Sequence, residues 1–207
     1  LMGLNEKKFK QLNYLVKNKT FINFLIKNVS SIHSNIIKGK KNCVILNYDE
    51  KLNNFLKWYQ QLSAESLGKK GKGIFPIIST MPKDNHSLLQ LYLDGPKNNF
   101  FSFFISRERD PFRFNNNYLI EGLDHLYKKN IDQVLHAQQR ATQKVFKTKK
   151  LPFRSFEIIK RSEETLGELF TFFILETLML STLLNVNPIN QPSVELIKIE
   201  TKKILKK

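Results

Sequence analysis

The chain has 207 residues, a length that suits one large domain or a domain with an appendage. Hydrophobic residues make up 41% and charged residues 25%, a balance near the globular average that excludes a disordered, collagen-like or mucin-like chain. Lysine and arginine (34) outnumber aspartate and glutamate (18), which gives a net charge of +16. That charge would suit nucleic acid, an anionic membrane or a phosphorylated metabolite, and does not choose among them.

Cysteine content and apolar runs bear on the compartment. Cys43 is the single cysteine, which excludes a disulfide framework and favours a reducing, cytoplasmic compartment. The apolar run 169–184 is shorter than the roughly 20 residues that span a bilayer, and it carries Glu176. We therefore expect a core helix there. The chain starts at Leu1 without a signal-peptide pattern, so we expect a fragment whose N-terminus lies upstream.

Helices and short apolar runs alternate along the first half of the chain. Helical periodicity predicts two packed helices between Glu6 and Lys38. The run 43–48 predicts a strand, and Asp49 after it can cap a helix that extends through Leu62. A second strand at 74–78 and a helix at 86–93, capped by Asp84 or Asn85, are expected to follow.

The second half continues the same alternation. Strands are predicted at 100–105 and 153–159, separated by a long helical pattern from Leu119 to Val145. The apolar helix through Leu184 follows, and Pro192 suits the first turn of a last helix with a buried stripe at Val194, Ile197 and Ile204. Because the strands read as continuous apolar runs between helices, we expect an α/β fold, a three-layer αβα sandwich with a mainly parallel sheet.

The first candidate site is a pair of residues near the end of a helix. Gln61 and Glu65 are spaced i and i+4, so their side chains leave the same helical face. We expect that face to point beyond the sheet edge where open α/β sheets bind ligands. The negative end of the helix dipole disfavours a charged Glu65 and so favours its acting as a base. The alternative is a plain ion pair with Lys69.

Two more candidate positions lie farther along the chain. His86 follows Asn85 at an expected helix start, where the positive dipole end would keep the ring neutral and able to accept a proton. An ordinary surface or capping histidine is the alternative. Gln191 and Lys198 are two helical turns apart and could read sugar hydroxyls and an anion from one face, whereas the alternative for Lys198 is a solvated side chain on a lysine-rich tail.

Three motifs follow one another in the order expected of a known family. They are Gln61-Leu62-Ser63-Ala64-Glu65-Ser66-Leu67-Gly68-Lys69, then Asp84-Asn85-His86-Ser87-Leu88-Leu89-Gln90-Leu91-Tyr92-Leu93-Asp94-Gly95-Pro96, then Asn187-Pro188-Ile189-Asn190-Gln191-Pro192-Ser193-Val194-Glu195-Leu196-Ile197-Lys198. Together they resemble the glucose-6-phosphate isomerase family, and the resemblance covers most of the chain from about Lys40 onward.

The resemblance implies an aldose-ketose isomerase that interconverts glucose 6-phosphate and fructose 6-phosphate, on a sugar-isomerase type αβα sandwich, without a metal or cofactor. It implies that Glu65 moves the proton through a cis-enediol, and that His86 assists ring opening in the neighbouring subunit of a homodimer. By the same resemblance, Lys198 joins in proton transfer at the ring oxygen, while Gln61 and Gln191 hold the sugar phosphate.

The resemblance also divides the chain. It implies a helical connector from a missing N-terminal domain at 1–40, a second sugar-isomerase type domain at 41–186, and a C-terminal loop and helix at 187–207 that carry site residues. The family's Gly-Gly-Arg signature and its Ser/Thr-rich phosphate loop do not occur in the sequence. We therefore expect the phosphate-binding residues upstream of Leu1, and the fragment alone to be inactive.

Two alternatives belong to other functional classes. A basic nucleic-acid-binding module would cluster its cations on one element with interleaved aromatics, whereas here the charge is scattered and phenylalanines lie in apolar runs. A non-catalytic sugar-phosphate-binding domain would not be expected to keep the Glu65, His86 and Lys198 motifs together. We expect neither nucleic acid nor a membrane as a partner.

Overall fold

A computed structural model describes residues 5–108 and 122–206 of the chain. Four parallel strands form one sheet in the order β2-β1-β3-β4, which confirms the α/β class and the parallel sheet. The strands are β1 (Asn42–Asn47), β2 (Phe75–Thr80), β3 (Asn99–Ser106) and β4 (Phe153–Ile158). Since the chain passes from β1 to β2 on one side and then to β3 on the other, the order of the strands reverses between β1 and β3.

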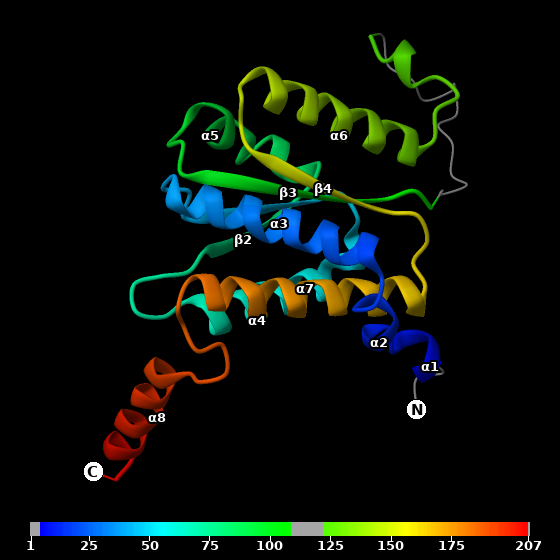
Figure 1. The fold of residues 1–207 in the computed structure, drawn as a ribbon. Coiled ribbons are helices and arrows are strands. Elements are labelled where there is room, and N and C mark those ends of the chain that lie inside the picture. Colours follow the sequence, from blue (N-terminus) through cyan, green and yellow to red (C-terminus); the bar gives the residue numbers. More distant parts are fainter. Residues whose placement is uncertain (1–4, 109–121, 207) are drawn as a thin grey trace.

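Helices cover both faces of this sheet (Figure 1). One layer contains α3 (Lys19–Ile37), α4 (Asn53–Leu67) and α7 (Glu163–Leu183), and the other contains α5 (Leu89–Asp94) and α6 (Ile131–Thr148). Alternate residues of β1 serve the two cores: Cys43 and Ile45 pack with the first layer, and Val44 and Leu46 with the second. This double burial, shared by β3, explains why the two central strands read as continuous apolar runs.

The N-terminal segment differs from the two helices expected there. The structure has two one-turn helices, α1 (Glu6–Phe9) and α2 (Leu12–Leu15), before α3. Asn18 caps α3 by accepting hydrogen bonds from the backbone of Thr20 and Phe21, so the long helix begins there. Helix α3 buries three residues in the same core as the sheet, Leu25, Val29 and Ile32. The domain boundary expected at residue 40 stays a prediction.

Two other helices begin later than predicted. Helix α6 starts at Ile131, because Asn130 and Gln133 form a capping box there, and the Leu119 of the expected helix lies outside the described residues. Helix α5 starts at Leu89, not at residue 86. Asp84 does not cap it, because its two carboxylate oxygens accept from the Thr80 backbone and the Ser87 hydroxyl around a short 3-10 turn, Lys83–Asn85.

A buried ionic network joins the helices of the first layer to the sheet. The Glu176 carboxylate on α7 is fully buried, pairs with Arg154 of β4, and accepts from the Tyr59 hydroxyl of α4 at 3.1 Å. Arg154 also donates to Ser102 of β3 at 2.8 Å. Burial, and then the charge of Glu176, raise the pKa of Tyr59 well above its usual range. Burial works against the Arg154 guanidinium, but the Glu176 carboxylate outweighs it, so the pKa of Arg154 is raised.

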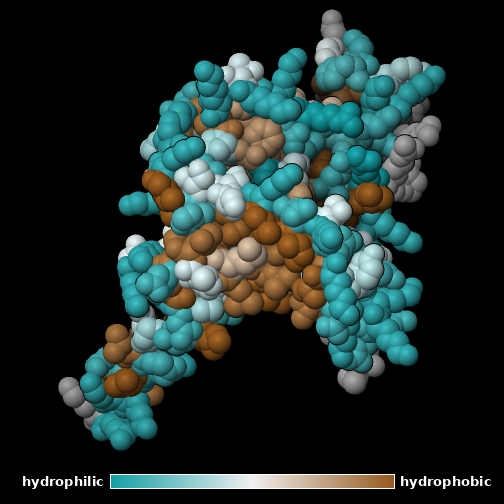
Figure 2. Space-filling view, viewed as in Figure 1, coloured by the Kyte–Doolittle hydropathy of each residue, from teal (hydrophilic) through white to brown (hydrophobic). Residues whose placement is uncertain are grey.

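Helix α7 is the one helix in the described part of the chain that is long and apolar enough to cross a membrane, a test that core helices also pass. It packs against α3, α4, α1 and α2, as the sequence predicts for a core helix. Its outward side chains Ile174 and Leu178 remain exposed, as does Phe24 of α3. Figure 2 shows an apolar surface on the side of the molecule where these helices lie.

The last helix, α8 (Pro192–Ile204), projects from the body of the molecule (Figure 1). Pro192 occupies its first turn, as expected. The predicted buried stripe is wrong, since Val194, Ile197 and Ile204 are 45%, 69% and 70% exposed. The period of the apolar residues was read correctly, but α8 has no neighbouring element in the described chain against which to bury them.

Candidate active site

Three of the predicted site residues meet around one carboxylate. The side-chain amide of Gln61 donates to Oε1 of Glu65 at 2.9 Å, and that of Gln191 donates to Oε2 at 2.8 Å. Gln61 and Glu65 lie one turn apart on α4, whereas Gln191 arrives from the loop between α7 and α8. Both carboxylate oxygens are therefore oriented by amides, while the Glu65 side chain stays exposed on the surface.

The chain turns tightly between the end of α4, which carries this carboxylate, and the start of β2. Helix α4 ends at Leu67, and the following loop comes back under the helix end before β2 begins. Gly73 has φ +111°, and a Cβ there would lie 2.7 Å from the carbonyl oxygen of Leu67. Only glycine accepts both that backbone conformation and that approach without strain. This turn fixes where the end of α4 lies relative to the sheet.

Two lysines of the same turn connect α4 to the chain after α7. The Lys69 ammonium donates to the carbonyl oxygen of Asn187 at 2.5 Å and to that of Ser66 at 3.1 Å. Lys72 donates to the carbonyl oxygen of Leu184 at 2.8 Å. Partial burial lowers the pKa of Lys69, and the negative charge of Glu65 acts in the opposite direction. The alternative of a Glu65–Lys69 ion pair is not realised, since Lys69 binds backbone carbonyls instead.

Lys198 lies on exposed α8 and forms an ion pair with Glu195 at 2.6 Å, with 65% of its side chain exposed. The expectation that Gln191 and Lys198 share a helical face is wrong. Gln191 precedes the helix with φ −136° and ψ 63°, a backbone conformation outside the helix. The structure therefore brings Gln191, and not Lys198, to Glu65.

His86 lies at the opposite edge of the sheet from Glu65. Helix α4 returns from the end of β1 to the start of β2, so Glu65 lies at the amino edge, whereas His86 follows the carboxyl end of β2. A six-residue strand spans roughly 20 Å. The expectation that Glu65 faces the carboxyl edge, where open sheets bind ligands, is therefore wrong. So is the helix-start argument for His86, because that exposed residue follows a 3-10 turn.

The carboxyl edge holds an ionic arrangement that sequence reasoning missed. Arg161 donates to both carboxylate oxygens of Asp49 at 2.8 Å and pairs with Glu108 at 2.7 Å. Asp49 follows β1 and Glu108 follows β3, so Arg161 bridges the point where the strand order reverses. The backbone N–H of Arg161 donates to Glu108, and this lowers the pKa of that carboxyl. The acidic residues Asp49 and Glu108 after two strand ends were a signal that the sequence offered for this arrangement. No feature of the sequence pointed to Arg161 as their partner.

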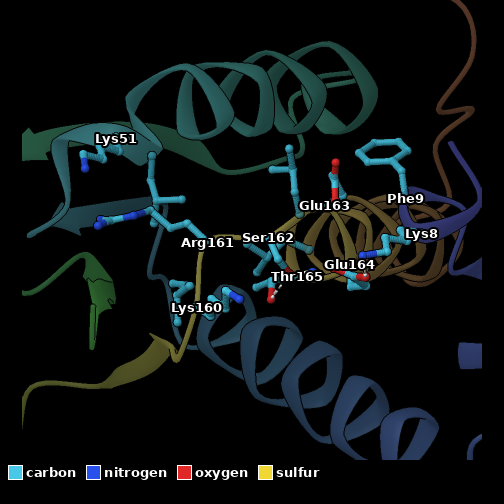
Figure 3. Close-up of a pocket in the computed structure, with 13 residues that line it drawn as sticks. Lys8, Phe9, Lys51, Lys160, Arg161, Ser162, Glu163, Glu164 and Thr165 are labelled. Atoms are coloured by element: carbon cyan, nitrogen blue, oxygen red, sulfur yellow. Dashed lines mark hydrogen bonds and ion pairs between the residues drawn. The ribbon is translucent and has the colours of Figure 1, made fainter. Parts of the chain in front are cut away.

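Beside Arg161 lies an open cavity of about 560 Å³ (Figure 3). Several of its charged groups are engaged within the chain: Lys8 pairs with Glu164, and Glu163 accepts from the backbone of Asn5. The Ser162 hydroxyl accepts from the backbone of Thr165 at the start of α7. Among residues 5–108 and 122–206, no group of three or more His, Cys, Asp or Glu side chains could hold a metal ion.

Comparison with known proteins adds named relatives. No family model matches the chain. A glucose-6-phosphate isomerase of Methanocaldococcus jannaschii is 34% identical over 168 residues, which are 81% of this chain and 40% of that protein. The glucose-6-phosphate isomerase of Mycoplasmopsis synoviae is 37% identical over 159 residues, 75% of this chain and 37% of that protein. The chain thus spans about 40% of the length of such relatives.

Solved structures share the fold. A hypothetical protein of Thermus thermophilus superimposes with a TM-score of 0.83 and 25% identity over 96% of this chain and 49% of that one. A glucose-6-phosphate isomerase of Chlamydia trachomatis gives a TM-score of 0.64 over 81% of this chain and 35% of that one. At 17% identity the second likeness shows the fold alone.

Proposed function

Because the chain belongs to the glucose-6-phosphate isomerase family, we propose that it is the C-terminal portion of an enzyme that interconverts glucose 6-phosphate and fructose 6-phosphate. The chemistry is an aldose-ketose isomerisation through a cis-enediol. Glu65 is the base in this proposal, and the residues that bind the phosphate group belong to the part of the enzyme that this chain does not span.

The observation that carries the proposal is the arrangement around Glu65. Two amides, one from a residue 4 positions away and one from a residue 126 positions away, hold its two carboxylate oxygens, at 2.9 and 2.8 Å. Neutral amide donors orient a carboxylate without neutralising it by an ion pair. An exposed carboxylate held in this way remains able to approach a bound sugar and accept a proton from carbon, which is what a general base requires.

The proton balance of the proposed reaction closes without any further reactant. Glu65 takes the proton from C2 of the open-chain aldose while the C1 carbonyl oxygen gains a proton, which gives the cis-enediol. Glu65 then returns its proton to C1 while the hydroxyl on C2 loses one, which gives the ketose. The negative charge that develops on the enediol oxygens needs nearby donors or cations. Lys198 supplies such a cation in this proposal and assists proton transfer at the ring oxygen.

His86 enters the proposal through a second subunit. Within one chain it follows the carboxyl end of β2, and Glu65 lies at the amino edge. A hexose phosphate cannot reach from one edge to the other. The enzyme is therefore proposed to act as a homodimer in which His86 assists ring opening in the active site of the partner, and Gln61 and Gln191 also contact the sugar phosphate.

The test replaces Glu65 by glutamine in the protein made from its complete gene. Glu65→Gln keeps the shape and removes the basicity, so kcat should fall by about 10² to 10⁴-fold while substrate binding survives. Glu200→Gln, an exposed carboxylate paired with Lys203 on α8, is the matched control and should leave kcat unchanged. Exchange of the C2 proton with solvent measures the proton abstraction itself. If Glu65→Gln exchanges that proton at the wild-type rate, Glu65 is not the base.

A further inference from the structure

The contact between Gln191 and Glu65 depends on how the loop after α7 is held against α4. Residues 187–191 are anchored to the helix end by two charged or polar contacts, the Gln191–Glu65 hydrogen bond and the bond from Lys69 to the Asn187 carbonyl. The Gln191–Glu65 hydrogen bond joins two groups that are proposed to act on the substrate. The Lys69–Asn187 hydrogen bond lies beside these groups and has no part in the proposed chemistry.

Lys69 has the geometry of a bridge. Its ammonium lies between the Ser66 carbonyl, at 3.1 Å near the end of α4, and the Asn187 carbonyl, at 2.5 Å on the other segment. Asn187 is the first residue of the loop, and its side chain accepts from the Ile189 backbone at 2.9 Å. The turn that follows therefore starts from the residue that Lys69 holds. A cation near a helix C-terminus also interacts favourably with the unpaired carbonyl groups and the negative dipole end there.

A neighbouring lysine supports the same end of α7. Lys72 donates to the Leu184 carbonyl at 2.8 Å, so the chain leaving α7 is held to the turn after α4 at two points. Of these two lysines, Lys69 is the one that binds within the 187–191 loop itself. Lys70, between them, is exposed and has φ 54°, with no hydrogen bond or ion pair in the described structure.

We propose that Lys69 is a positioning residue, whose bridge between Ser66 and Asn187 holds the 187–191 loop so that the Gln191 amide meets Glu65. It acts through Gln191 and does not touch the substrate. This inference rests on the proposed function for its kinetic consequence, and on the contacts alone for its structural one.

The kinetic test compares Lys69→Met with Lys70→Met in the protein made from its complete gene. Both changes remove one positive charge at adjacent positions, but only the first breaks the bridge. Misplacing a site group by about 1 Å costs up to about 10²-fold, so Lys69→Met should lose roughly 10- to 100-fold in kcat/KM, and Lys70→Met should stay near wild type. Equal losses in both variants would show a general charge effect and would overturn the proposal.

A double-mutant comparison separates positioning from a merely structural role. Lys69→Met should cost little in a Gln191→Ala background, because the group that it positions is already gone. A full additional loss in that background would mean that Lys69 acts independently of Gln191, and this would overturn the proposal. Thermal unfolding should show Lys69→Met and Lys70→Met both fully folded at the assay temperature, so that the kinetic difference does not reflect unfolding.

Hydrogen exchange at the Ile189 amide tests the Lys69 bridge without reference to activity. That amide should exchange about 10-fold faster in Lys69→Met than in Lys70→Met, since a hydrogen bond to a charged group is lost beside it. A wild-type protein without isomerase activity would refute the proposed function, but hydrogen exchange would still show whether Lys69 holds the loop. Equal exchange rates in the two variants would refute the Lys69 bridge even in a fully active enzyme.

Discussion

The buried Glu176 carboxylate offers the most quantitative test of this fold. Glu176 has no exposed surface, and its partners come from two other elements, Arg154 on β4 and the Tyr59 hydroxyl on α4. Glu176→Gln keeps the shape but leaves the Arg154 guanidinium buried beside a neutral amide. Breaking a buried pair by removing one charge costs about 3–5 kcal/mol, a large share of the roughly 5–15 kcal/mol by which domains are stable.

The exposed pair of Arg107 and Glu157 provides the control. Its side chains are 59% and 39% exposed, although the pair also links β4 to the end of β3. A surface ion pair contributes about 0–1 kcal/mol, so Glu157→Gln should change stability little. The double change Arg154→Met with Glu176→Leu removes both buried charges and should recover much of the loss seen for Glu176→Gln.

Urea unfolding of the three variants measures these differences. Trp58 is the single tryptophan and lies on α4 with its ring centroid 4.2 Å from that of Phe170 on α7, so its fluorescence reports the packing of these helices. With a urea dependence of about 2 kcal/mol per molar, the midpoint for Glu176→Gln should fall by roughly 1.5–2.5 M. If Glu176→Gln shifts the midpoint no more than Glu157→Gln does, the network contributes no more than a surface pair, and the reasoning is wrong.

Three further outcomes follow from the site, the core and α8. Mixing Glu65→Ala and His86→Ala subunits should restore part of the activity through heterodimers with one intact site, and no recovery despite confirmed subunit exchange would mean that both residues act in one chain. Burial raises the pKa of Cys43 from 9.0 to about 11, so at pH 8 the native thiol should react at least about 100-fold more slowly than the urea-unfolded thiol; comparable alkylation rates would contradict its burial. Ile197→Asn should change the stability of the chain by less than about 0.5 kcal/mol, against about 2–5 kcal/mol for Leu25→Ala, and a similar cost for both in urea would show that α8 packs.

The sequence predicted those elements whose environment leaves a regular pattern of residues along the chain. The central strands β1 and β3 could be located because each is buried on both faces and therefore reads as an apolar run, whereas the edge strands β2 and β4 are only partly buried. The Gln61–Glu65 contact could be predicted because i and i+4 neighbours meet on any helix. Helix starts at Ile131 and Leu89 were missed because they depend on which side chains cap the backbone, and Asp84 proved to be engaged elsewhere.

Contacts between distant segments could not be read from spacing. Gln191 reaches Glu65 only because α7 returns the chain to the end of α4, and the Lys69 and Lys72 contacts complete that arrangement. Arg161 gave no signal for a similar reason, since its two acidic partners follow different strands. The apolar period of α8 was correct as a helical signal but could not show whether a neighbouring element covers it.

The two edges of the sheet differ in what they leave available for chemistry. At the carboxyl edge, where a ligand would be expected between β1 and β3, Arg161 is already engaged in bridging Asp49 and Glu108. At the amino edge, the Glu65 carboxylate is oriented but remains exposed. A general base needs to be held and also reached, and among the predicted site residues only Glu65 meets both conditions within one chain. Any group that joins it from the carboxyl edge, as His86 is proposed to do, therefore has to come from another copy.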